Sequence, residues 1–296
     1  MNSTSPTRIA RVIDAHVHLW DPARTDWYPY LSAGQAALNM GDVSGMSRRF
    51  DVPTYRSETA GWNVEKLVNV AAATGAHSID ETLELDRRAD QDGHPDAIIG
   101  GLPPAGSPAE SIAAIDRQCA AARFRGVRPM GAAGPALPHA DVLRALAERG
   151  LVYEVMAHPD QLVDAARGLA EHGDLTVVIE HTGWPRNDGA DERALWRAGI
   201  DALANVGPNV MCKLSGLAMP LRSMAPDVLA PWIGHAIEAF GPDRCLFASN
   251  FPVDGMHGSF DQLYSSYAAV TADLDDQARD KLFAANAERI YRLTAD

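Results

Sequence analysis

Short apolar runs recur along the whole chain, and most are followed by a stretch in which apolar residues return with helical spacing. An apolar run of about four to eight residues between polar or turn residues is typical of a buried β-strand. The predicted strands are residues 9–15, 66–71, 97–102, 126–130, 151–156, 175–181, 209–214 and 245–250. The predicted helices are residues 78–91, 108–123, 140–149, 159–172, 192–205, 226–240, 260–272 and 275–293.

Strands that alternate with helices form parallel sheets with right-handed crossovers, and eight such units are the number that closes a barrel. Most strand starts lie about 25–35 residues apart, which suits the repeat of a (β/α)8 barrel. The predicted fold class is therefore α/β, a TIM barrel that forms a single domain over residues 1–296. We expect an inserted loop after the first strand and an extra C-terminal helix packed on the outside. An open doubly wound sheet is the competing fold, but no GxGxxG motif follows the first strand.

The inserted loop is expected between the first two strands. Residues 21–62 carry three prolines and few periodic apolar residues. The segment is predicted to lie over the barrel mouth and to bring Trp20, Trp27, Tyr28 and Tyr30 near the site.

Charge and composition narrow the classes of partner. The chain has 26 basic and 39 acidic residues, and its net charge of −13 is spread along the sequence. No basic stripe is present, which argues against nucleic acid and anionic membranes as partners. The chain shows neither an apolar signal segment nor a run as long as a membrane span, and its three cysteines form no CxxC pair. These features predict a soluble cytoplasmic protein whose partner is a small molecule.

The first predicted strand leads into a pair of histidines, His16 and His18, separated by one residue. Side chains alternate along a strand, so both imidazoles are expected on the same face. Two imidazoles that converge at a strand end suit a divalent metal ion. The alternative is that one histidine is a hydrogen-bonded core residue and the other caps the strand.

Polar side chains also stand near the C-terminal ends of later predicted strands, where TIM barrels place their active sites. In chain order these candidates are Arg128, Glu154, His158, His181, Trp184, Lys213, Asn250 and Asp254. Core packing does not explain polar groups at so many strand ends, because burying them without partners is costly. Ser215 and Ser249 lack a Gly-x-Ser-x-Gly context, so a serine triad is not expected.

Four motifs in order, IDAHVHLWDP, IEHTGWP, KLSG and SNFPVD, resemble the amidohydrolase-2 branch of the amidohydrolase superfamily. The segment RFRGVRP and the closing Asn286-Ala287 and Ile290-Tyr291 extend the resemblance over nearly the whole chain. Within this branch the sequence is most similar to sugar-lactone and dicarboxylate-lactone hydrolases. The resemblance implies a (β/α)8 barrel and hydrolysis of a cyclic ester, or less often C–N cleavage or decarboxylation.

The resemblance also implies a metal site. In metal-using relatives, the residues that match His16, His18 and His181 hold a divalent ion, here expected to be zinc or manganese, together with an aspartate of the last strand. This sequence departs from the pattern, because Asn250 stands where the family has the aspartate of SDWP. An amide can coordinate through its oxygen but cannot accept a proton from water as a carboxylate does. Weaker metal binding is expected, and catalysis without metal stays open because some lactone-hydrolysing relatives use none.

The candidates for the catalytic residues are Asp254, Glu154, His158 and Asn250. Glu154 has two competing interpretations besides proton transfer, an outward surface charge or an ion pair with Arg128. His158 suits a base and a helix cap equally well. Asp14 is expected on the same face as His16, deeper in the barrel and in a structural role.

The remaining candidates are predicted to bind substrate. Arg128 would grip a carboxylate or a hydroxyl-rich substrate, because its guanidinium pairs bidentately with such groups. Lys213 would stabilise an oxyanion or neutralise a substrate acid. Trp184 and Trp20 would stack on a substrate ring, unless they only fill the barrel mouth.

The primary prediction is a hydrolase that opens a small polar lactone by attack of water at the barrel mouth. A metal-dependent decarboxylase on the same fold and a catalytically silent ligand-binding barrel are the alternatives. A homodimer is expected only because the resembled family commonly forms dimers.

Overall fold

The computed structural model describes residues 9–32, 44–130 and 137–293, and it contains an eight-stranded sheet in the order β1 to β8. The strands are β1 (Val12–Val17), β2 (Val64–Val70), β3 (Ala97–Leu102), β4 (Phe124–Pro129), β5 (Val152–Val155), β6 (Val177–Ile179), β7 (Val210–Leu214) and β8 (Cys245–Phe247). Each strand pairs in parallel with the next one along the chain. The predicted α/β barrel is confirmed.

The barrel closes where the chain beyond β8 runs beside β1. The amide of Asn250 donates to the carbonyl of His16 at 2.9 Å, and the amide of His18 donates to the carbonyl of Phe251 at 2.8 Å. These backbone bonds fix the histidine pair next to Asn250. The seam of the barrel therefore lies inside the predicted site.

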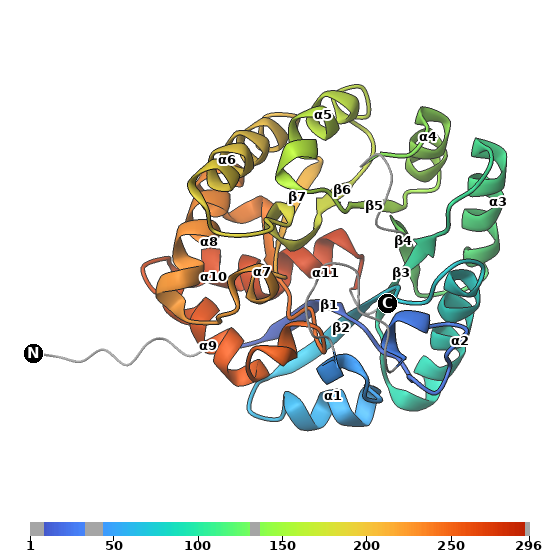
Figure 1. Cartoon of the computed structure of the whole chain (residues 1–296), viewed down its shortest axis with the longest axis horizontal. Helices are drawn as coiled ribbons and strands as arrows, with labels where there is room; N and C mark the ends of the chain where they lie inside the picture. Colours follow the sequence, from blue (N-terminus) through green and yellow to red (C-terminus); the bar gives the residue numbers. More distant parts are fainter. Residues whose placement is uncertain (1–8, 33–43, 131–136, 294–296) are drawn as a thin grey trace, which may run out of the picture.

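Helices alternate with the strands and surround them, as Figure 1 shows. They are α1 (Val52–Glu58), α2 (His77–Asp92), α3 (Pro108–Gln118), α4 (Ala140–Glu148), α5 (Pro159–Leu169), α6 (Ala190–Ala204), α7 (Ala218–Leu221), α8 (Pro226–Phe240) and α9 (Phe260–Val270). No helix in the described ranges has both the length and the apolar character needed to cross a membrane.

Apolar side chains pack on both faces of the sheet. Inside the barrel lie Ile13, Ala15, Val68, Val70, Ile99, Val152, Val178, Met211, Leu246 and Ala248. Between the strands and the helices lie Leu67, Leu162, Ile179, Trp196, Leu214, Trp232 and Phe247, among others. Burial on both faces explains why the strands read as continuous apolar runs in the sequence.

The C-terminal segment closes the bottom of the barrel, so the prediction that it packs on the outside is wrong. It consists of α10 (Asp276–Asp280), a π-helical stretch (Lys281–Ala285) and α11 (Asn286–Ile290). Ala284, Ala287, Ile290, Tyr291 and Leu293 join the apolar cluster of the barrel interior. The carbonyl of Tyr291 accepts a hydrogen bond from Arg125 near the start of β4. Helical spacing predicts an amphipathic helix, but it carries no information about which end of a barrel the apolar face covers.

The segment between β1 and β2 contains regular structure in its described residues, 18–32 and 44–63. It contains α1, in which the Asp51 side chain accepts from the Thr54 amide at the helix start. Trp20 and Phe50 form an isolated antiparallel bridge that holds the segment against the end of β1. Residues 33–43 of the predicted loop lie outside the described residues.

We predict that Ile290→Ala destabilises the protein by about 2–5 kcal/mol, because it leaves a cavity where α11 plugs the barrel. The matched control Leu195→Ala removes an exposed side chain from α6 and should change the free energy of unfolding by less than about 0.5 kcal/mol. Urea unfolding of both variants measures the difference. Equal effects would show that the C-terminal plug does not hold the barrel together.

Candidate active site

Three histidines meet at the C-terminal end of the barrel. His16 and His18 come from the end of β1, and His181 follows β6. His16 Nε2 and His18 Nε2 are 3.2 Å apart, and the ring centres of His16 and His181 are 4.7 Å apart. Burial lowers the pKa of all three rings, that of His181 to about 3, and nearby positive charges lower these pKa values further. The cluster is therefore uncharged at neutral pH.

The orientation of His18 is fixed by a backbone group and a neighbouring ring. Its Nδ1 lies 2.8 Å from the carbonyl oxygen of Val70, so Nδ1 carries the proton and Nε2 keeps a lone pair. The ring of Trp20 stacks on His18 with a centre-to-centre distance of 5.6 Å. The indole nitrogen of Trp20 donates to the carbonyl of Arg48. Trp20 thus forms a fixed wall beside the histidines.

A left-handed turn after β6 directs the side chains of Glu180 and His181 into the barrel. The 3-10 turn Glu180–Gly183 follows Ile179, and His181 (φ 53°) and Thr182 (φ 55°) lie in the left-handed region. Residues other than glycine adopt this conformation rarely, and such strain clusters at functional sites. Gly216 packs against the turn so closely that an added Cβ would lie 2.5 Å from the His181 ring.

Glu180 is a site residue that the sequence reasoning missed. Its Oε2 lies 3.2 Å from Arg128 and 3.7 Å from His181 Nε2, and its Oε1 lies 3.9 Å from His16 Nδ1. The carboxylate is buried, and Oε1 accepts no hydrogen bond. Alternation along a strand places Glu180 and His181 on opposite faces, and only the left-handed turn brings both inward. The sequence signal that could have identified Glu180 is its position next to His181 at the end of a predicted strand.

Lys213 and Glu154 form a fully buried ion pair inside the barrel. The ammonium lies 2.6 and 2.8 Å from the two carboxylate oxygens, and Tyr291 donates its hydroxyl to Glu154 Oε1 at 2.6 Å. The ammonium also lies 3.4 Å from His16 Nδ1. Burial raises the pKa of Glu154 to about 7, although the charge of Lys213 lowers it.

These contacts correct two expectations. Glu154 is neither an outward surface charge nor the partner of Arg128, because Arg128 pairs with Glu180. Lys213 points into the barrel as predicted, but its charge is already neutralised by Glu154.

Asn250 and Asp254 lie together at the end of β8. The Asn250 side chain donates from Nδ2 to Asp254 Oδ1 at 3.0 Å and also contacts His18. Asp254 is fully buried, and its Oδ2 has no hydrogen-bond partner. Burial raises the pKa of Asp254 to about 7, while the bond from Asn250 lowers it. Position 250 carries an amide in place of the expected carboxylate, and the carboxylate of Asp254 is hydrogen-bonded to that amide.

Asp14 has the expected structural role, but its side chain does not lie on the same face as His16. The register of β1 against β2 slips by one residue between Asp14 and Val17, which breaks the strict alternation of faces. Asp14 accepts hydrogen bonds from the amide of Ser249 at 2.8 Å and from the hydroxyl of Tyr55 in α1 at 2.9 Å. It therefore anchors α1 and the chain after β8 behind the site.

His158 and Trp184 form the rim near His181. His158 precedes α5, and its backbone amide donates a hydrogen bond to Gln161 Oε1 at 3.1 Å. Its Nδ1 lies 2.9 Å from the carbonyl of Trp184, and the two rings stack 4.6 Å apart. The Trp184 ring lies edge-on to His181 at 5.9 Å. These bonds favour the capping interpretation of His158 and leave Trp184 half-buried at the mouth.

His16, Glu180 and His181 form a candidate metal-binding cluster, in which one ligand atom of each lies within 4.8 Å of the others. The hydrogen bonds of His16 do not fit a tightly held cation. An ammonium group has only donors, so Lys213 needs a lone pair on His16 Nδ1 and leaves the ring proton on Nε2. In that tautomer the proton faces the lone pair of His18 Nε2, and neither Nε2 atom offers a free lone pair to a metal.

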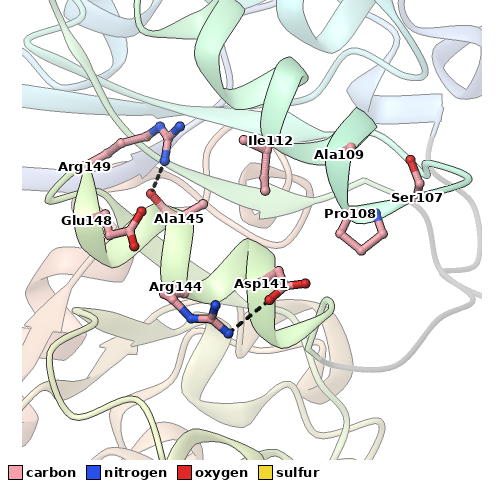
Figure 2. Close-up of a pocket in the computed structure, with 9 residues that line it drawn as sticks. All are labelled: Ser107, Pro108, Ala109, Ile112, Asp141, Arg144, Ala145, Glu148 and Arg149. Carbon is pink, nitrogen blue, oxygen red and sulfur yellow. Dashed lines mark hydrogen bonds and ion pairs between the residues drawn. The ribbon is translucent and has the colours of Figure 1, made fainter.

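A separate groove of about 550 Å³ lies between α3 and α4, outside the barrel. Figure 2 shows Arg144 paired with Asp141, and Arg149 bonded to the carbonyl of Ala145, along its floor. None of the strand-end side chains lines this groove. It is therefore not part of the candidate site.

Comparisons with known proteins agree with the fold and the motifs. A family model described as Amidohydrolase matches residues 13–293. The uncharacterized protein y4mH of Sinorhizobium fredii is 30% identical over 301 residues, which cover 95% of this chain and 98% of the relative. L-fucono-1,5-lactonase of Burkholderia multivorans is 28% identical, with 95% and 96% covered. The crystal structure of a Burkholderia multivorans amidohydrolase with bound zinc has a TM-score of 0.78 at 26% identity, with 96% of this chain and 100% of that chain covered.

We predict that Asp254→Asn stabilises the protein more at pH 8 than at pH 5. The folded pKa of about 7 lies above the ordinary value of 3.8, so the folded state binds the proton more tightly than the unfolded state. The wild type therefore loses stability as pH rises from about 4 to about 7, whereas an amide does not titrate. Thermal unfolding at both pH values tests this, with the exposed Asp273→Asn as control. The same difference from wild type at both pH values would contradict it.

Proposed function

Because the chain belongs to the amidohydrolase family, we propose that it is a hydrolase that opens a small polar lactone by attack of water at the barrel mouth. The observation that carries the proposal is Asp254, a buried carboxyl with a pKa of about 7 that Asn250 links to the histidine cluster. Perturbed acids of this kind are typical of catalytic sites. Two relatives named as L-fucono-1,5-lactonase, 28% and 26% identical, support a lactone as the substrate class.

Asp254 is the residue best suited to move the proton. Asn250 holds Oδ1 by its amide, which leaves Oδ2 free to accept a proton. A base with a pKa near the working pH combines a large ionised fraction with sufficient basicity. In the proposed reaction, water loses a proton to Asp254 as its oxygen attacks the ester carbon. The ring C–O bond then breaks, and the proton passes to the leaving oxygen to give a hydroxy acid.

Arg128 is proposed to hold the ester carbonyl or a substrate hydroxyl. Its Nη1 donates to Glu180 Oε2 and its Nη2 donates to the carbonyl of Ala71, so the guanidinium is fixed in place. Its buried Nε has no hydrogen-bond partner. A fixed donor directed at developing negative charge stabilises the transition state without reorganisation.

The histidines are proposed to shape the floor of the site as neutral hydrogen-bonding groups. Trp20 and Trp184 line its walls, where flat rings suit a sugar or dicarboxylate lactone. Glu154 and Lys213 neutralise each other inside the barrel and are not assigned direct contact with the substrate. Asn250 positions Asp254. A small molecule is proposed as the partner at this site, and the homodimer stays a prediction.

We predict that the purified protein opens at least one member of a panel of sugar lactones and dicarboxylate lactones. Asp254→Asn should lower kcat by about 10²- to 10⁴-fold with little change in KM, because the base is lost while the binding groups remain. In the wild type, kcat should rise with pH up to about 7 and then level off, because the ionised base is the active form. A pH-stat assay measures ring opening, and Asp273→Asn is the matched control.

Two results would contradict this assignment. One is an inert protein across the panel together with carbon dioxide release from an aromatic acid. The other is an Asp254→Asn variant with wild-type kcat.

We predict that activity survives prolonged dialysis against a chelator. The reason is that Lys213 engages the Nδ1 lone pair of His16, and Asn250 offers no carboxylate charge to a cation. The rate before and after dialysis is compared in metal-free buffer. Loss of activity that added zinc or manganese restores would establish a metal-dependent reaction instead.

A further inference from the structure

A continuous row of buried polar groups runs from the bottom of the barrel to the histidine cluster. Tyr291 donates to Glu154 at 2.6 Å, Glu154 accepts two bonds from Lys213, and the Lys213 ammonium lies 3.4 Å from His16 Nδ1. Each of the four side chains is fully buried. They come from β1, β5, β7 and the residue after α11, so the row joins the plugged end of the barrel to its active end.

The hydrogen-bond donors and acceptors in this row favour one arrangement while Lys213 and Glu154 are charged. The ammonium has three protons, of which two face the Glu154 oxygens and the third faces His16 Nδ1. His16 must then carry its proton on Nε2, where it meets the lone pair of His18 Nε2. The row ends at the carbonyl of Val70, which accepts from His18 Nδ1.

Packing alone does not account for these residues. Removing two charges from water is expensive, and apolar side chains of similar volume often stabilise a protein as well or better. The barrel interior around the row holds the apolar side chains of Val152, Val178 and Met211, and Glu180 lies against Glu154. A buried pair kept at this place is best explained by what it does to the group beside it, which is His16.

We propose that Tyr291, Glu154 and Lys213 form a positioning network that holds His16 as the Nε2–H tautomer. The network makes the histidine cluster a hydrogen-bonding site and lowers its affinity for divalent metal. It also makes the C-terminal segment part of the active site, because Tyr291 orients Glu154. The link to turnover rests on the proposed lactone hydrolysis, but the tautomer and the metal affinity do not.

The direct test is a two-bond ¹H–¹⁵N spectrum of protein labelled with ¹⁵N-histidine. In the wild type, His16, assigned with a His16→Gln variant, should show a protonated Nε2 and an accepting Nδ1. In Lys213→Met/Glu154→Gln, which removes both charges together and so avoids a lone buried ion, His16 should lose this pattern. Tyr291→Phe should shift it in the same direction by a smaller amount. Tyr267→Phe removes a buried hydroxyl that binds the Ala248 carbonyl instead, and it should leave the spectrum unchanged.

Zinc affinity gives a second readout that needs no substrate. Competition with a chromophoric chelator should show about 10- to 100-fold tighter zinc binding by the double variant than by the wild type, the range seen when groups behind metal ligands are changed. Equal or weaker binding by the double variant would overturn the proposal, as would a wild-type spectrum with His16 protonated on Nδ1. A Tyr291→Phe spectrum identical to wild type would remove the C-terminal segment from the network.

The two proposals fail separately. A protein that opens no lactone but shows the predicted His16 tautomer and zinc affinities contradicts the proposed function alone. An active lactonase in which the double variant leaves both readouts unchanged contradicts the positioning network alone.

Discussion

The structure depends on how charged side chains are accommodated in the buried interior of the barrel. Ionised groups are buried at low cost only when they are paired and hydrogen-bonded. The barrel meets this condition with two ion pairs, Lys213 with Glu154 and Arg128 with Glu180. Asp254 has no cationic partner, and burial raises its pKa accordingly. Arg128 Nε, Glu180 Oε1 and Asp254 Oδ2 are among the buried polar atoms of the described residues that have no hydrogen-bond partner.

The fold follows from the sequence because its signals are local and repeated. Apolar runs and helical spacing predict the eight strands and the long helices to within a few residues, although the short helices α1 and α7 were not predicted. Eight such units leave little choice other than a barrel. The same local signals do not say where the C-terminal helix packs. Whether its apolar face covers the outside or plugs the bottom depends on Ile290 and Tyr291 meeting residues far away in the chain.

The site was predictable where side chains follow regular strands, and less so where the backbone departs from them. The histidines, Arg128 and the Asn250–Asp254 pair stand near strand ends and converge as expected. Glu180 was missed because a left-handed turn overrides alternation, and the face of Asp14 was wrong because β1 slips in register. The ion pair between Glu154 and Lys213 depends on how close two strands lie in space, and the sequence of one strand does not predict that distance.

The exchange of a carboxylate for an amide at position 250 is accommodated within a short loop. Asn250 keeps the backbone bond that closes the barrel and directs its side chain to Asp254, four residues later. The family scaffold is thus retained with a carboxylate, Asp254, hydrogen-bonded to the residue at position 250.

A crystal structure with the hydroxy-acid product of an active lactone, grown in metal-free buffer, tests the central claim most directly. The account predicts that the product lies in the barrel mouth, with one carboxylate oxygen hydrogen-bonded to Arg128 Nε and the new hydroxyl near Asp254 Oδ2. A product bound to a metal ion between His16 and His18, or seated in the groove between α3 and α4, would contradict it.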